Sequence, residues 1–146
     1  MADPLSVTAS VAGLIGLVGS ILEGCLFLKN FAKDAKNAPK DISNLAIELS
    51  TMETAVKTFE ALVMDYWSKG YITSIDDYTP ALKQCLGIVD DMSLSIKTDV
   101  AAFKDGSGGC WNKLKAAGKK SDITEGRGRL TAAINYLQVV QNNLQR

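Results

Sequence analysis

The chain has 146 residues, of which 47% are hydrophobic, and its 16 basic and 16 acidic side chains balance to a formal net charge of zero. This length suits one domain with its own core, so we expect a single domain over residues 1–146. The neutral balance does not indicate nucleic-acid binding. A chain without histidine cannot form a His-dependent catalytic triad or a His-containing zinc site. We therefore predict that the protein is not an enzyme and binds no metal or cofactor.

The first element is a run of nineteen residues without a charge, PLSVTASVAGLIGLVGSIL, at residues 4–22. As a helix it would rise about 28 Å, close to the roughly 30 Å of a bilayer's hydrocarbon core. It is apolar on all sides, with one stripe of larger residues and another of small ones. Its serines, threonine and glycines make it only weakly hydrophobic, and Asp3 precedes it where a signal peptide needs basic residues. A buried core helix and a membrane helix both remain open at this point.

Two amphipathic helices follow. Apolar residues spaced three and four apart predict the first over residues 42–66, with Pro39 near its start and Gly70 after its end. The same spacing predicts the second over residues 75–103. Both helices would turn one apolar stripe toward a shared core.

The glycine-rich residues 105–109 then interrupt the helical pattern. A short basic helix is expected over residues 110–120, and a last amphipathic helix over residues 121–144. Gly126 and Gly128 weaken the first turns of this last helix, which are therefore either frayed or closely packed. No segment alternates with the period of a strand, so we predict an all-α fold, a helical bundle of four long helices plus one short helix.

Three cysteines, Cys25, Cys85 and Cys110, are far apart in the sequence and odd in number. None of them has C-x-x-C spacing, so they predict neither a zinc site nor a redox motif. We interpret them as small hydrophobic side chains in a reducing cytosol.

The last quarter of the chain is basic, since residues 106–146 hold seven basic and two acidic side chains. Basic side chains near an anionic membrane gain about 1 kcal/mol each, so this region is a candidate site for lipid headgroups. A basic face in contact only with water is the alternative. The candidate headgroup residues are Lys113, Lys115, Lys119, Lys120, Arg127 and Arg129.

Two segments carry a resemblance to a known family. The opening MADPLSVTASVAGLIGLVGSI resembles the start of the HeLo-like domains, which stand at the N-termini of fungal STAND proteins and related cell-death proteins. The closing CWNKLKAAGKKSDITEGRGRLTAAINYLQVVQNNL is similar to the same family's last segment, a Trp- and Lys-rich turn that leads into a helix with Leu and Ala at heptad spacing. With the long helix between them, the resemblance touches most of the chain.

The resemblance implies a helical-bundle effector domain of programmed cell death, as in heterokaryon incompatibility and fungal innate immunity. Activation in that family drives oligomerisation, after which the N-terminal helix leaves the bundle and breaches the membrane. The trigger in that family is typically a receptor domain or an amyloid-forming motif attached C-terminally. Neither is present in this sequence, so the resemblance implies a domain excised from a longer protein. The implied partners are anionic membrane lipids, further copies of the chain and that upstream trigger, without nucleic acid. A dimer at rest is compatible with so apolar a bundle. The domain would be cytoplasmic at rest and at the plasma membrane when active.

Two functions follow as hypotheses. In the first, the domain executes cell death by permeabilising a membrane through its N-terminal helix. In the second, it is a protein-interaction and oligomerisation module of a STAND immune receptor, and the first helix stays in the core, where its glycines serve close packing. For the first hypothesis, the membrane-inserting residues would be Leu5, Val7, Val11, Leu14, Ile15, Leu17, Val18, Ile21 and Leu22. The residues that pack helix against helix would be Gly13, Gly16, Gly19 and Ser20.

Overall fold

A computed structural model of the chain describes the backbone of residues 4–34, 40–102 and 120–145, and the side chains of residues 11–33, 44–97 and 123–145. These residues form four helices: α1 (Pro4–Asp34), α2 (Lys40–Ser68), α3 (Thr79–Ala102) and α5 (Lys120–Leu144). The described segments contain no strand, so the all-α class and the four long helices are confirmed. The short helix expected over residues 110–120 lies outside the described residues except at Lys120, where α5 begins.

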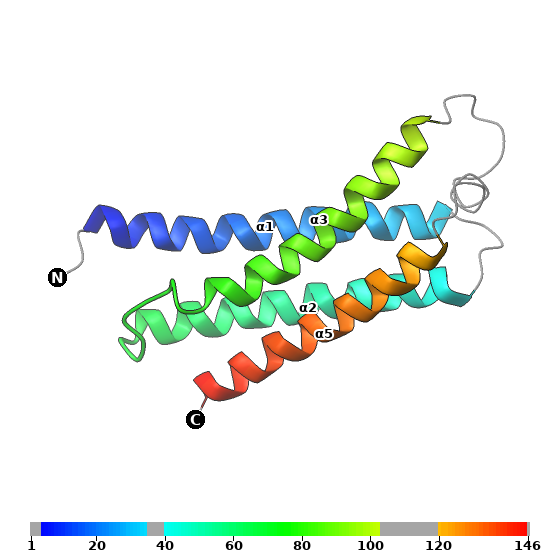
Figure 1. Ribbon diagram of the computed structural model, residues 1–146. Helices are drawn as coiled ribbons and strands as arrows, with labels where there is room; N and C mark the ends of the chain where they lie inside the picture. Colours follow the sequence, from blue (N-terminus) through cyan, green and yellow to red (C-terminus); the bar gives the residue numbers. More distant parts are fainter. Residues whose placement is uncertain (1–3, 35–39, 103–119, 146) are drawn as a thin grey trace.

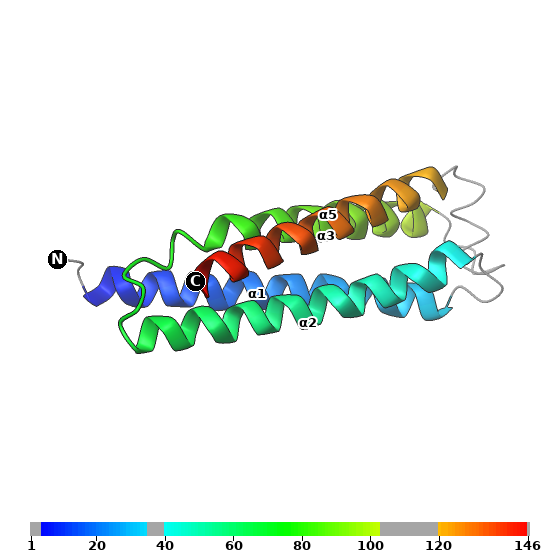
Figure 2. The same ribbon diagram turned by 90° about the horizontal axis from the view of Figure 1, so that it is seen from below.

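Successive helices run in opposite directions along the bundle (Figure 1). α1 packs against α2 and α3, and α5 packs against the same two helices from the other side. Two of these contacts join parallel helices, α1 with α3 and α2 with α5, and α1 and α5 are diagonal to each other (Figures 1 and 2). α1 therefore has only two extensive helix neighbours among the described elements.

The core lies along the bundle axis and takes one stripe from each helix. The stripes have the spacing of three and four that the sequence shows, so the expected apolar faces of the long helices are confirmed. Their central fully buried members are Leu14, Ile21, Cys25 and Leu28 of α1; Leu45, Leu49, Met52, Val56, Phe59 and Val63 of α2; Leu82, Cys85 and Val89 of α3; and Leu130, Ala133 and Leu137 of α5.

α2 ends at the glycine that the sequence predicts. Gly70 has a φ of 76°, a left-handed conformation that glycine adopts without a steric penalty. The Gly70 N–H donates to the Trp67 carbonyl and the Tyr71 N–H to the Tyr66 carbonyl, at 3.1 and 2.9 Å, the two bonds of a Schellman cap. The Tyr66 and Tyr71 rings meet edge to face with centroids 5.6 Å apart, which adds the apolar contact typical of this cap.

Two glycines mark close helix contacts. A Cβ at Gly24 of α1 would collide with Val89 Cγ1 of α3, and Ser93 Oγ would lie 3.7 Å from it. A Cβ at Gly126 of α5 would lie 2.7 Å from the Met92 sulfur of α3. The start of α5 is therefore closely packed at Gly126, whereas a Cβ at Gly128 would meet nothing within 4 Å.

The same substitution at two glycines of α1 should have opposite effects. Gly16→Ala should raise the free energy of unfolding by up to about 1 kcal/mol, because alanine favours a helix more than glycine and its methyl group would meet nothing within 4 Å. Gly24→Ala should lower it, since overpacking against Val89 costs about 1–3 kcal/mol and outweighs the gain in propensity. Urea denaturation measures both changes. A Gly24→Ala chain as stable as Gly16→Ala would contradict the close approach of α1 to α3.

Candidate functional site

The candidate site is α1, which is apolar on all sides but covered on one. Over Val11–Lys33 it is long and apolar enough to cross a membrane, and it is the one such helix among the residues whose side chains are described. Within an 18-residue apolar window of this stretch, only 28% of the helix is buried inside the bundle. An all-apolar helix whose only role is to form a core is mostly buried. The exposure of the rest of α1 therefore needs a physical explanation.

The residues expected to insert into a membrane are divided between the two faces of α1. Leu14, Val18 and Ile21 are buried in the core. Val11, Leu17 and Leu22 are half-buried at its edges, and Ile15 is 52% exposed. The side chains of Leu5 and Val7 lie outside the described residues.

The small residues expected to pack helix against helix are all exposed in the bundle. Gly13, Gly16, Gly19 and Ser20 face away from the core, and a Cβ at any of the three glycines would meet nothing within 4 Å. They therefore do not bring α1 close to another described helix. The glycine that does so is Gly24, which the sequence pattern places in the same small-residue stripe without distinguishing it.

A larger apolar residue extends this exposed face toward the end of α1. Leu26 is 54% exposed, similar to Ile15, and sequence reasoning did not single it out. The sequence pattern places Leu26 between the stripe of larger residues and the stripe of small ones, together with Ile15, Leu17 and Leu22. Exposed leucines and isoleucines are common singly, but Ile15 lies among exposed glycines on a segment without charge, whereas Leu26 follows the exposed Glu23. The outer face of α1 is therefore apolar over the described residues before Glu23.

The C-terminal part of α1 carries polar contacts to both neighbouring helices. Lys29 Nζ donates a hydrogen bond to Glu53 Oε1 of α2 at 2.6 Å, and the two side chains are 27% and 19% exposed. On the other side, Lys97 Nζ of α3 lies 4.7 Å from the centroid of the Phe27 ring. Such a cation–π contact is favourable because the face of the ring is electron-rich.

Of the six candidate headgroup residues, the two arginines already have acidic partners. Arg127 donates from Nε and Nη2 to the Glu48 carboxylate of α2, with a shortest distance of 2.9 Å. Arg129 Nη2 lies 3.3 Å from Asp91 Oδ2 of α3. The side chains of Lys113, Lys115, Lys119 and Lys120 lie outside the described residues.

Two of the three cysteines are free thiols within the core. Burial raises the pKa of Cys25 to about 12, with smaller contributions in the same direction from Glu53 and Cys85. Burial also raises the pKa of Cys85, to about 11. Both thiols are therefore protonated at neutral pH and are poor nucleophiles, because the thiolate is the reactive form. Cys110 lies outside the described residues.

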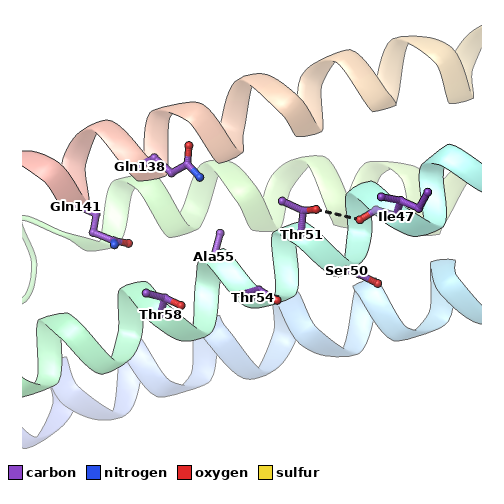
Figure 3. Close-up of a pocket in the computed structure, with 8 residues that line it drawn as sticks. All are labelled: Ile47, Ser50, Thr51, Thr54, Ala55, Thr58, Gln138 and Gln141. Atoms are coloured by element: carbon purple, nitrogen blue, oxygen red, sulfur yellow. Dashed lines mark hydrogen bonds between the residues drawn. The ribbon is translucent and has the colours of Figure 1, made fainter.

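A shallow groove of about 550 Å³ lies between α2 and α5 (Figure 3). Gln138 and Gln141 of α5 line it opposite hydroxyl-bearing residues of α2 such as Thr54 and Thr58. No charged residue lines the groove, so it offers hydrogen bonds but no acid or base for catalysis. In the segments with described side chains, no cluster of three or more His, Cys, Asp or Glu residues is placed to hold a metal ion.

Comparison with known proteins adds no relative, since the chain matches no protein-family model, no curated protein and no solved structure.

The two arginines of α5 should differ in their effect on stability. Arg127→Met should lower the free energy of unfolding by about 1–3 kcal/mol, because Glu48 loses a charged hydrogen-bond partner at a site where both side chains are mostly buried. Arg129→Met is the matched control. Its ion pair is exposed, so the change should stay below about 0.5 kcal/mol. Urea denaturation at low and high salt measures both, and equal effects would contradict this distinction.

Proposed function

We propose that the domain executes regulated cell death by permeabilising a membrane with α1. The observation that carries this proposal is the partial burial of α1. This helix is long and apolar enough to cross a membrane, yet only 28% of its 18-residue apolar window is buried inside the bundle. The resemblance of the opening and closing segments to HeLo-like domains supports the same mechanism. In this proposal the bundle is the resting, cytoplasmic form, and the plasma membrane is the target.

The physical basis is that α1 has two competing environments. In the bundle, its stripe from Leu14 to Ile21 is buried while Ile15 remains in water. In a bilayer both faces would be covered, at a gain of roughly 25 cal/mol per Å² of apolar surface removed from water. The opposing cost is the core that α1 leaves behind. A trigger that clusters several copies shifts this balance toward the membrane.

Oligomerisation in the membrane would use the small residues on the outer face of α1. Gly13, Gly16 and Gly19 have open space around them in the bundle, so this face is available to a second copy. Small residues let transmembrane helices approach closely, which strengthens their van der Waals packing. The basic residues of the last quarter of the chain would hold the domain at anionic headgroups.

A substitution at one exposed residue of α1 tests membrane insertion without disturbing the folded core. Ile15→Glu keeps the core intact because Ile15 is 52% exposed, yet it places a charge inside the inserted helix. A central charge costs about 2.5–3.5 kcal/mol on insertion, so dye release from anionic vesicles should slow by more than about tenfold. Leu94→Glu on α3 is the matched control, since Leu94 is 67% exposed and outside α1. Its release rate should equal that of the parent chain.

The assay compares the purified chain with and without a fused oligomeriser, and circular dichroism checks that each variant is folded. Equal release by Ile15→Glu and the parent chain would contradict insertion of α1. No release by the clustered parent chain would reject permeabilisation and favour the interaction module.

A further inference from the structure

α1 is held to the bundle differently on the two sides of Gly24. Among the described residues before it, 11–23, no side chain forms a hydrogen bond, an ion pair or a ring contact with another helix. This part is held by apolar burial, chiefly of Leu14, Val18 and Ile21. Its glycines leave open space on the outer face. No directional contact to another helix therefore holds residues 11–23 in place.

The part after Gly24 has specific contacts on both sides. Lys29 is ion-paired to Glu53 of α2 at 2.6 Å, and both side chains are largely buried. Phe27 lies under the Lys97 ammonium of α3. Moving this part away would separate a mostly buried ion pair, which leaves uncompensated charge at the bundle surface. Apolar burial adds to these contacts, because Cys25, Leu28 and Phe31 are in the core.

Gly24 itself lies at a close contact between α1 and α3, against Val89 and Ser93. Glycine is the weakest helix former after proline, so the helix bends or ends there more easily than at other residues. Ser93 adds a further weak point, because its hydroxyl is buried without a hydrogen-bond partner. Separation of the helices at this level would hydrate that hydroxyl.

The length of the first part matches a membrane. Residues 4–23 are twenty residues, and at 1.5 Å each they rise about 30 Å, the thickness of the hydrocarbon core. Glu23, their last residue, is exposed and carries the first charge after Asp3. The described part of α1 without polar contacts to other helices thus ends where the first charged residue of the helix, Glu23, occurs.

We propose that α1 divides at Gly24, so that residues 4–23 leave the bundle and enter the membrane while residues 24–34 stay fixed to α2 and α3. This inference rests on the proposed membrane function and adds how much of the helix moves. The Lys29–Glu53 ion pair is the anchor that stops separation, and the domain stays attached to the membrane surface through it.

The test measures two distances from α1 to α2 by pulsed electron–electron resonance. One spin-label pair is placed at Ser20→Cys and Ala61→Cys, and the other at Asn30→Cys and Ser50→Cys, four positions that are all exposed. The full chain is used with Cys110 replaced by serine. Cys25 and Cys85 need no replacement because both are fully buried, with thiol pKa values of about 12 and 11. Labelled chains are diluted with unlabelled ones on anionic vesicles.

On vesicles, the distance of the first pair should lengthen by at least about 10 Å, one helix diameter, while that of the second stays as in solution. Lengthening of both pairs would overturn the division at Gly24 and leave membrane insertion standing. Dye release without a change in either pair would overturn the division and α1 insertion together. Neither dye release nor a distance change would overturn the proposed function and this inference with it.

A separate substitution tests whether the Lys29–Glu53 ion pair is the anchor. Glu53→Lys places a second cation beside Lys29, so the distance of the second pair should then lengthen on vesicles. Glu60→Lys, two turns further along α2, is the matched control and should leave that distance unchanged. Adding Lys29→Glu to Glu53→Lys should restore the short distance. An unchanged second pair in Glu53→Lys would overturn the assignment of this ion pair as the anchor.

Discussion

The constraint on which this structure depends is that α1 is apolar on every side while the bundle covers only one of them. Its two extensive neighbours, α2 and α3, bury the stripe from Leu14 to Phe31. α5 lies diagonally across the bundle (Figure 2), so the outer face of α1 is left to water. Over residues 11–22 the bundle accepts this exposure because five of the six exposed residues are glycine, alanine or serine, which expose little apolar surface.

This constraint also explains where polar contacts occur along α1. The described residues before Glu23, 11–22, carry no charge and cannot form an ion pair, so apolar burial is what holds this part of α1 to the bundle. The first lysine of the chain, Lys29, is the residue that joins α1 to α2. The charge pattern of the sequence therefore separates two segments of α1. Core packing holds both segments to the bundle, and the second also has an ion pair.

Sequence reasoning predicted the helices well because burial imposes a period of 3.6 on each of them. The stripe from Leu45 to Val63 and the end of α2 at Gly70 both follow from local chemistry. Local chemistry does not determine which side of an all-apolar helix is buried. The sequence pattern places Gly16 and Gly24 in one stripe of small residues, and it could not predict that only Gly24 lies against another helix. Nor does it pair Arg127 with Glu48, which is 79 residues away.

The most direct test of the central claim, that α1 leaves this bundle for a membrane, is hydrogen exchange of backbone amides in solution and on anionic vesicles. Amides of residues 11–23 should become strongly protected on vesicles, because the hydrocarbon core holds no water to exchange with. Amides of α3 before Val89 should exchange faster there. Because α1 and α3 run parallel and Gly24 meets Val89, this earlier part of α3 is the part that residues 11–23 cover in the bundle. Identical exchange of both segments in solution and on vesicles, with the domain bound, would contradict the account.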